Sequence, residues 1–254
     1  VLTLLLILGG LLWANLEYGW GGQEGIMIAS TAVLVVFILL STNAGSSAVT
    51  GEIEQRTWGV LLTTPLTPRE ILTAKALGTL RRLWILPTAI LCTQGVGVLA
   101  GTTHPLLLVI TACVLLGTAV LLATSGVFFS LVAKRTSGAG SLNFLFAFSL
   151  WAGSLILCGL VGWIVQPRGD PWFLGLCLVL NPVFLVGVAA EALTSHRGRF
   201  SYNHLDIPGL ASNLDVWSYT AVCVGYLIVA VLFSLFLLRL ASARWDRWAI
   251  RRMA

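Results

Sequence analysis

Charged side chains are scarce in this sequence. Only 10% of its 254 residues are Asp, Glu, Lys or Arg, whereas 57% are hydrophobic and the mean hydropathy is +0.94. Soluble globular domains carry roughly 25% charged residues, so the scarcity excludes an ordinary soluble domain. Several long apolar runs predict instead an all-α, polytopic membrane protein, because a helix satisfies its own backbone hydrogen bonds inside a bilayer.

Ionisable side chains are almost absent from the apolar runs themselves. Ion-coupled carriers and intramembrane hydrolases need such groups at membrane depth, where they are costly enough to mark function. The sequence also lacks a G-x-x-x-x-G-K-[ST] phosphate-binding loop. We therefore expect neither an ion-coupled carrier nor an enzyme, and we expect no catalytic, cofactor or metal residues. Energy for any transport would come from a separate subunit.

Cysteine pairs and metal-ligand spacings are also missing. The cysteines are Cys92, Cys113, Cys158, Cys177 and Cys223. Each lies inside an apolar run, so we interpret them as small buried hydrophobic residues rather than disulfides or metal ligands. His104, His196 and His204 fall in predicted outer loops. We interpret them as ordinary loop residues, although three histidines on one face could bind a metal.

Six apolar segments predict membrane spans, and a seventh is broken. The six cover residues 1–16, 26–40, 83–100, 106–132, 142–165 and 216–238. The first is shorter than a full span, which needs about 20 residues. We therefore expect that the chain is truncated or that its true start lies upstream, and the basic region of a signal peptide is missing. The broken segment, 172–190, is interrupted by Asn181-Pro182, where proline suits a pair of half-helices.

Basic residues decide the predicted topology. If 172–190 enters and leaves on the same side, all 15 Lys and Arg residues except Arg168, Arg197 and Arg199 face the cytoplasm. This arrangement follows the positive-inside rule, which a full crossing would violate at the basic C-terminal tail. We therefore predict six spans in the plasma (inner) membrane, both termini cytoplasmic, and an outer segment over 172–215. Because the basic residues flank spans, the net charge of +5 does not indicate nucleic acid.

The charges inside the chain gather in a polar island over residues 51–82. Pro65 divides the island into two predicted short helices. The apolar stripe of the first consists of Ile53, Thr57, Val60 and Leu61. The second begins with a capping box, in which Thr67 is the N-cap, Pro68 the first helical residue and Glu70 the reciprocal partner.

Two stretches of this island, EIEQRTW (52–58) and LLTTPLTPREIL (61–72), resemble the type-2 permeases of ATP-binding-cassette transporters. The resemblance implies one permease domain over 1–254, with the island as a cytoplasmic coupling-helix hairpin between spans 2 and 3. It also implies a re-entrant pair of half-helices before span 6, a separate ATPase subunit that holds ATP and magnesium, and a second permease copy or homologue. Some relatives serve copper-enzyme maturation, and that branch is one candidate for this chain.

Within the hairpin, we expect Glu52, Glu54 and Arg56 to make polar contacts with the ATPase subunit. Trp58 and Leu61 would be apolar anchors, because interfaces centre on a few aromatic and arginine residues. Two alternatives stay open. Glu54 and Arg56 could form only a solvated surface pair, or the island could be an interfacial helix pair with no partner.

These features predict the permease of an ATP-driven exporter. Closure of the ATPase pair would move the 51–62 helix and tilt the attached second and third spans. The alternative is a non-transporting membrane scaffold or assembly factor that anchors a cytoplasmic partner. Uncharged spans suit a lipid-like, glycan-lipid or apolar cargo, and the sequence leaves the substrate, the direction and the choice of homodimer or heterodimer open. We expect Lys75, Arg81 and Arg82 to lie at the lipid headgroups.

Overall fold

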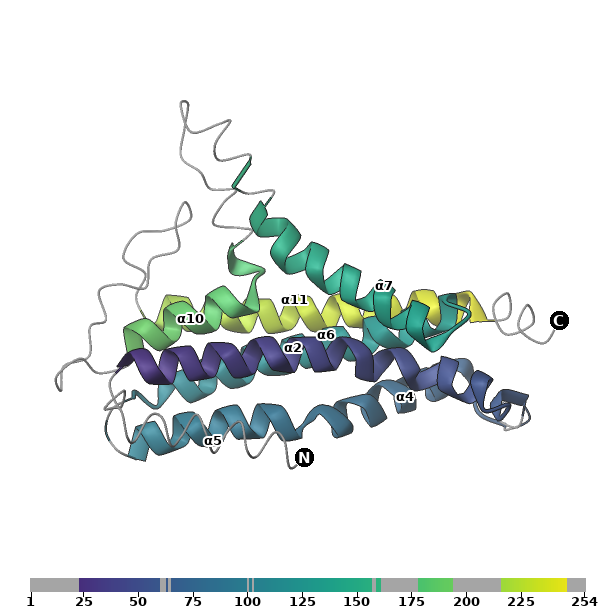
Figure 1. The fold of residues 1–254 in the computed structure, drawn as a ribbon, viewed down its shortest axis with the longest axis horizontal. Coiled ribbons are helices and arrows are strands. Elements are labelled where there is room, and N and C mark those ends of the chain that lie inside the picture. Colours follow the sequence, from purple (N-terminus) through teal and green to yellow (C-terminus); the bar gives the residue numbers. More distant parts are fainter. Residues whose placement is uncertain are drawn as a thin grey trace. The chain divides into compact units, whose positions relative to one another are not determined.

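The computed structural model of the chain is built from helices (Figure 1). It describes residues 23–59, 63, 65–99, 101, 103–156, 159–160, 178–193 and 216–245. The elements in chain order are α2 (Gln23–Glu54), α4 (Pro68–Leu83), α5 (Ile85–Leu99), α6 (Leu106–Val132), α7 (Thr136–Phe148), the π-helical turn η1 (Ser149–Gly153), α10 (Pro182–Leu193) and α11 (Val216–Ala243). The all-α prediction is confirmed for the described part of the chain.

Four helical segments are long and apolar enough to cross a membrane. They are Ala32–Glu54, Leu106–Val132, Thr136–Ile156 and Val216–Ala243. The bent pair α4 and α5 adds a fifth if the two form one span. The chain is therefore a multi-pass membrane protein. The count of six stays a prediction, since the first predicted span, 1–16, lies outside the described residues.

The loop predicted between the fourth and fifth spans is much shorter than expected. Helix α6 coincides with the predicted span 106–132, but α7 already begins at Thr136. Most of the gap between the predicted spans 106–132 and 142–165 is therefore helical, because α7 already covers residues 136–141. A Cβ atom on Gly140 would lie 3.1 Å from Oδ1 of Asn43 in α2. The glycine thus permits close approach of two helices rather than flexibility.

The fifth candidate span contains a π-helical turn. Helix α7 runs directly into η1, and helical residues continue to Ile156. Each bond of a π-helix reaches back five residues, so this turn holds one residue more than an α-helical turn. Trp151 of η1 is buried and packs in a cluster with Leu122 of α6 and Ala230 of α11.

The break in the third predicted span lies at a different residue from the one that the sequence suggests. Proline is the usual cause of a helix break, but the chain bends between Leu83 and Ile85, at Trp84, and not at Pro87. Pro87 lies in the first turn of α5. Amide groups in a first helical turn have no partner within the helix, so proline is tolerated there.

Helix α10 begins where the sequence predicts a break. The side chain of Asn181 accepts hydrogen bonds from the amides of Val183, at 3.0 Å, and Phe184, at 3.3 Å, while Pro182 is the first helical residue. With 12 residues, α10 is too short to span a bilayer. Most of the predicted outer segment lies outside the described residues, so its re-entrant pair of half-helices stays a prediction.

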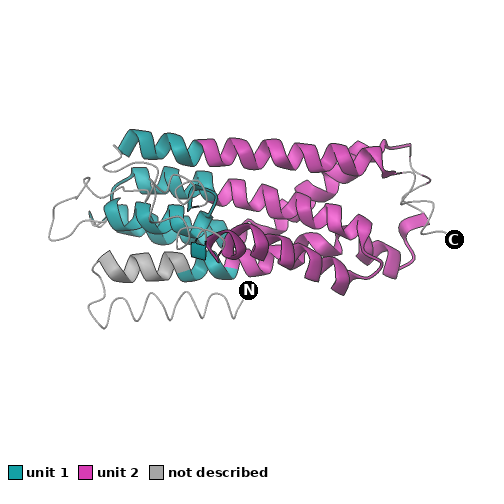
Figure 2. Cartoon of the chain, turned by 90° about the horizontal axis from the view of Figure 1, so that it is seen from above, with its two compact units in different colours: residues 1–36, 86–114, 158–224 teal, residues 37–85, 115–157, 225–254 magenta. Residues whose placement is uncertain are grey.

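The chain divides into two compact units (Figure 2). Unit 1 comprises 1–36, 86–114 and 158–224, and unit 2 comprises 37–85, 115–157 and 225–254. Helices α2, α6 and α11 contribute residues to both units. In unit 1, the buried phenol of Tyr219 donates a hydrogen bond to the carbonyl of Leu185 at 2.7 Å. The single permease domain over 1–254 stays a prediction.

In unit 2, small residues and one buried amide hold α2, α6 and α7 together. A Cβ atom on Gly126 of α6 would lie 2.7 Å from Cα of Gly45 in α2, so only glycine permits this crossing. The side chain of Asn143 in α7 donates to the carbonyl of Thr42 at 2.8 Å and accepts from Oγ of Ser125 at 2.7 Å. These contacts position the end of α2 beside the start of α7.

Candidate functional site at the end of helix α2

Helix α2 ends in a Schellman motif, in which two crossed backbone hydrogen bonds close the last turn. The amide of Thr57 bonds to the carbonyl of Glu52 at 2.9 Å, and the amide of Arg56 bonds to the carbonyl of Ile53 at 3.1 Å. The motif needs one residue in the left-handed conformation, usually glycine. Here that residue is Arg56, with a φ of 60°.

This helix end corrects the expected first helix of the island. We predicted one short helix with Ile53 and Thr57 on a common stripe, but α2 runs out of the apolar span without a break and stops at Glu54. Trp58 and Gly59 are helical again after the turn. This helix end could not be predicted from sequence, because the glycine that usually marks the motif is missing. We call residues 52–59 the coupling turn.

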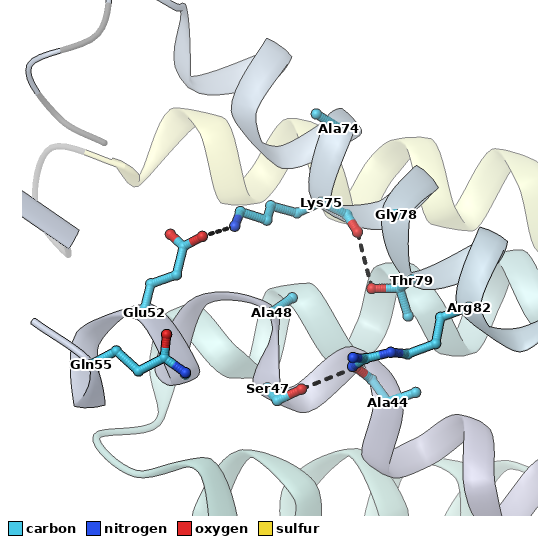
Figure 3. Close-up of a pocket in the computed structure, with 11 residues that line it drawn as sticks. Ala44, Ser47, Ala48, Glu52, Gln55, Ala74, Lys75, Gly78, Thr79 and Arg82 are labelled. Carbon is cyan, nitrogen blue, oxygen red and sulfur yellow. Dashed lines mark hydrogen bonds and ion pairs between the residues drawn. The ribbon is translucent and has the colours of Figure 1, made fainter. Parts of the chain in front are cut away.

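Glu52 faces α4 and forms an ion pair with Lys75 (Figure 3). The two side chains are 25% and 24% exposed, so the pair is partly shielded from solvent. We expected Lys75 at the lipid headgroups and Glu52 at the ATPase subunit. The structure instead uses the pair to join the last turn of α2 to the middle of α4.

Glu54 faces the start of α7. Its Oε1 accepts a hydrogen bond from the amide of Thr136 at 2.8 Å, and the hydroxyl of Thr136 donates to Oγ1 of Thr50 at 3.0 Å. The first amides of a helix have no partner within it, and a negative charge is favourable there. The hydrogen bonds from Thr136 therefore hold the pKa of the exposed Glu54 carboxyl below its ordinary value.

Trp58 faces inward. It is 5% exposed, and its ring centroid lies 5.4 Å from that of Trp245, which follows α11. The two indoles belong to a hydrophobic cluster that draws on four helices, which we call the Trp58 cluster. Its other buried members are Val49, Ile71, Leu72, Ala76, Val127, Leu131 and Ala241. An indole buried in this way anchors the coupling turn to its own chain.

Arg56 differs from the other described contact residues, because nothing in the described chain engages its guanidinium. Its side chain is exposed, and the structure gives it neither an ion pair nor a hydrogen bond among the described residues. Leu61 lies outside the described residues. The predicted set therefore does not form one exposed surface: two glutamates and a tryptophan are engaged within the chain, and the arginine is presented to solvent.

The capping box at the start of α4 is confirmed. The amide of Glu70 donates to Oγ1 of Thr67 at 3.4 Å, and Oε2 of Glu70 accepts from the amide of Thr67 at 2.8 Å. These hydrogen bonds lower the pKa of the Glu70 carboxyl. The box fixes where α4 begins, and it thereby sets the position of Lys75 opposite Glu52.

Sequence reasoning missed both the helix end at Arg56 and the distant partners of the coupling turn. Thr136 and Trp245 are functional neighbours of the coupling turn, yet each lies far away in the sequence. Neither belongs to a local motif, so no periodicity or spacing indicates the pairing. Glu54 and Arg56 do not form the solvated pair that we considered, because the carboxylate of Glu54 bonds to Thr136.

The sequence model for the ABC-2 family transporter protein matches residues 20–242 of the chain, which includes every helix described above except the last residue of α11. The chain belongs to the ABC-2 transporter family. ABC-2 permeases are membrane components of ABC transporters that are not themselves catalytic, and they work with a cytoplasmic ABC ATPase. No curated protein matches the chain.

The thiols and imidazoles of this ABC-2 permease were predicted to be inert. Cys92, Cys113 and Cys223 are free thiols, and Cys223 is buried as expected, but Cys92 is exposed on α5. Burial of every cysteine is therefore a wrong prediction. The described residues contain no group of three or more His, Cys, Asp and Glu side chains placed to hold a metal. His196 and His204 lie outside that part of the chain, and membership of the copper-maturation branch stays a prediction.

Proposed function

We propose that this ABC-2 permease is the membrane subunit of an ATP-driven exporter and that its coupling turn transmits the movement of an ATPase subunit. ATP and magnesium would be held by that subunit. The supporting observation is that the residues of the turn fall into two groups, those that contact the rest of the chain and one that does not. Glu52, Glu54 and Trp58 bind it to α4, α7 and the end of α11, whereas Arg56 is left for a partner.

The length of α2 supports a role as a lever. Its 32 residues give an axis of about 48 Å, which exceeds the hydrocarbon thickness of about 30 Å. The coupling turn at its end therefore lies beyond the apolar layer. A displacement of this turn acts on α4 and α7 at once, because the ion pair of Glu52 and the hydrogen bond of Glu54 join them.

Arg56 is the residue that we propose to contact the ATPase subunit. A guanidinium binds carboxylates through two parallel hydrogen bonds, and arginine is enriched among residues that dominate interfaces. We propose that Arg56 binds an acidic group of the ATPase, with Leu61 as an apolar contact beside it. Glu52, Glu54 and Trp58, which we first considered as direct contacts, then orient the turn from within the chain.

The same proposal includes six spans, a re-entrant pair of half-helices before the last one, and both termini in the cytoplasm of a plasma (inner) membrane protein. It also includes a second permease copy or homologue. Helix α11 is proposed to lie against lipid or against a helix of that second permease, because many of its large apolar side chains are exposed within this chain. They include Ile228, Val229, Leu232, Phe233, Leu235 and Phe236.

Co-purification tests the proposal. The tagged permease is co-expressed with the ATPase encoded beside it and extracted in mild detergent, and both the bound ATPase and its ATP turnover are measured. We expect Arg56→Glu to abolish binding and permease-dependent turnover. Lys134→Glu is the matched control, because Lys134 is an exposed cation in the loop before α7, and this variant is expected to retain both.

Two outcomes would contradict the proposal. If wild-type permease retains no ATPase, the coupling turn has another role. If the ATPase binds but its turnover is the same with and without the permease, the chain is better described as a scaffold that anchors a cytoplasmic partner.

A further inference from the structure

A polar groove separates the last turns of α2 from α4 within unit 2 (Figure 3). Its volume is about 600 Å³, and it opens to the surface of the unit. The walls carry Glu52 and Ser47 from α2 and Lys75, Gly78 and Arg82 from α4. The coupling turn uses only the Glu52–Lys75 pair at one end of this groove.

The charges of the groove do not balance. The carboxylate of Glu52 is paired with Lys75, whose ammonium has three N–H donors and gives one of them to that carboxylate. Arg82 has neither an ion pair nor a hydrogen bond to any described residue. Figure 3 shows its guanidinium extended across the groove toward α2, beside Ala44 and Ser47. One cation is thus left over at a place with room for an anion.

Gly78 lines the groove and adds no side chain to it. Glycine inside a helix is destabilising relative to alanine, so it is usually retained for a left-handed backbone or for a close contact. Neither reason applies here. Among the described glycines, Gly101 is the one with positive φ, and a Cβ atom on Gly78 would meet nothing within 4 Å. The missing side chain leaves space in the groove.

The position of Arg82 in the sequence indicates what enters that space. Arg81 and Arg82 form the last basic turn of α4, directly before α5, which carries no charged residue. Basic residues at the edge of an apolar membrane segment lie at the level of the lipid headgroups. Guanidinium groups bind phosphate through two parallel hydrogen bonds.

We propose that this groove binds the phosphate of an anionic membrane lipid. The guanidinium of Arg82 donates to the phosphate oxygens, the free donors of Lys75 face the same anion, and Gly78 gives the headgroup room between α2 and α4. The lipid thereby bridges the lever helix and its neighbour. This site is separate from ATPase docking, and its test needs no ATPase.

The test is lipid binding by the purified full chain in neutral detergent, followed by the thermal unfolding midpoint and by native mass spectrometry. Phosphatidylglycerol is added, with phosphatidylcholine and inorganic phosphate as separate arms. We expect phosphatidylglycerol alone to raise the midpoint. Arg82→Ala should weaken its binding about tenfold, which corresponds to the loss of one charged hydrogen-bonding group. Arg81→Ala is the matched control, because the neighbouring Arg81 does not line the groove.

A second variant keeps the test decisive if Arg82→Ala does not fold. Gly78→Leu retains both cations and fills the groove, and it is expected to prevent phosphatidylglycerol binding. Equal weakening by Arg81→Ala and Arg82→Ala would overturn the proposal, since it would indicate general attraction to a basic surface. So would equal protection by phosphatidylcholine, or undiminished binding by Gly78→Leu. A shift produced as strongly by inorganic phosphate would overturn the lipid as the source of the anion.

Discussion

Replacing Arg56 with glycine tests two properties of this residue separately: the backbone strain at the end of α2, and the binding of the ATPase by the guanidinium. Arg56 has a φ of 60°, and a side chain in this left-handed region costs about 1–2 kcal/mol. The greater freedom of glycine in the unfolded chain offsets about 0.4–1 kcal/mol of that cost. We therefore expect Arg56→Gly to raise the free energy of unfolding by about 0.8 kcal/mol, the difference between the middles of these two ranges. The exposed guanidinium makes no contact within the described chain whose loss would reduce this gain.

The assay is a pair of measurements on each variant in the same detergent. The thermal midpoint should rise by about 1–4 °C in Arg56→Gly, the range that this free energy gives for a chain of a few hundred residues. Co-purification of the ATPase should fall at the same time. Arg56→Ala is the control, because alanine keeps the Cβ atom and its cost but removes the guanidinium. It should lose the ATPase without gaining stability.

Two results would refute this reasoning at different points. A glycine variant less stable than the wild type would show that the left-handed residue is not strained. A glycine variant that is more stable and still binds the ATPase at the wild-type level would show that the arginine is not retained for docking. In the second case, the strain at the end of α2 would need another explanation.

Three further changes test the contacts within the chain. Trp58→Ala should lower the free energy of unfolding by about 3–5 kcal/mol, because it empties the centre of the Trp58 cluster. Trp58→Phe should cost less, since the buried indole nitrogen has no hydrogen-bond partner in the described part of the chain, and denaturation of both variants gives the comparison. Glu54→Gln should reduce stability near neutral pH and become neutral in acid. The pKa of Glu54 is lowered in the folded state, so its contribution is present above the unfolded value of about 4.3 and is lost as pH falls from there through the lower folded value; midpoints measured from about pH 7 to about pH 2 check this, and a pH-independent difference would contradict it. Gln94→Leu should stabilise the chain by about 1–3 kcal/mol, because the side chain is fully buried in α5 and neither amide atom has a hydrogen-bond partner among the described residues; a lower thermal midpoint would indicate that the amide has a partner elsewhere.

The sequence predicted those features that depend on near neighbours. The capping box of Thr67 and Glu70 acts over three residues, and the Asn181-Pro182 start of α10 acts over two or three. The bounds of α6 follow from an uninterrupted apolar run with polar residues at each end. Each of these signals is complete within one turn or one segment, so the sequence alone suffices.

Contacts between segments that are distant in the chain could not be predicted from the sequence. Gly140 and its neighbours resemble a flexible loop until Asn43 of α2 is placed against them. Trp58 resembles an exposed interface anchor until Trp245 covers it. Arg56 gives no sign of a helix end, because the Schellman motif is normally marked by glycine. In each case, the deciding residue lies on another helix or is absent from the usual position.

The π-helical turn η1 has a consequence for evolutionary comparison. One extra residue in a helical turn shifts the helical phase of the following residues by about 100°. A helical wheel drawn for a regular α-helix therefore assigns the residues after Gly153 to the wrong face. Deleting a single residue between Ser149 and Gly153 would convert the turn to α-helix and leave the helix continuous. An alignment of this permease with a relative that has a regular fifth helix therefore needs a one-residue gap inside the span, where alignments normally forbid gaps.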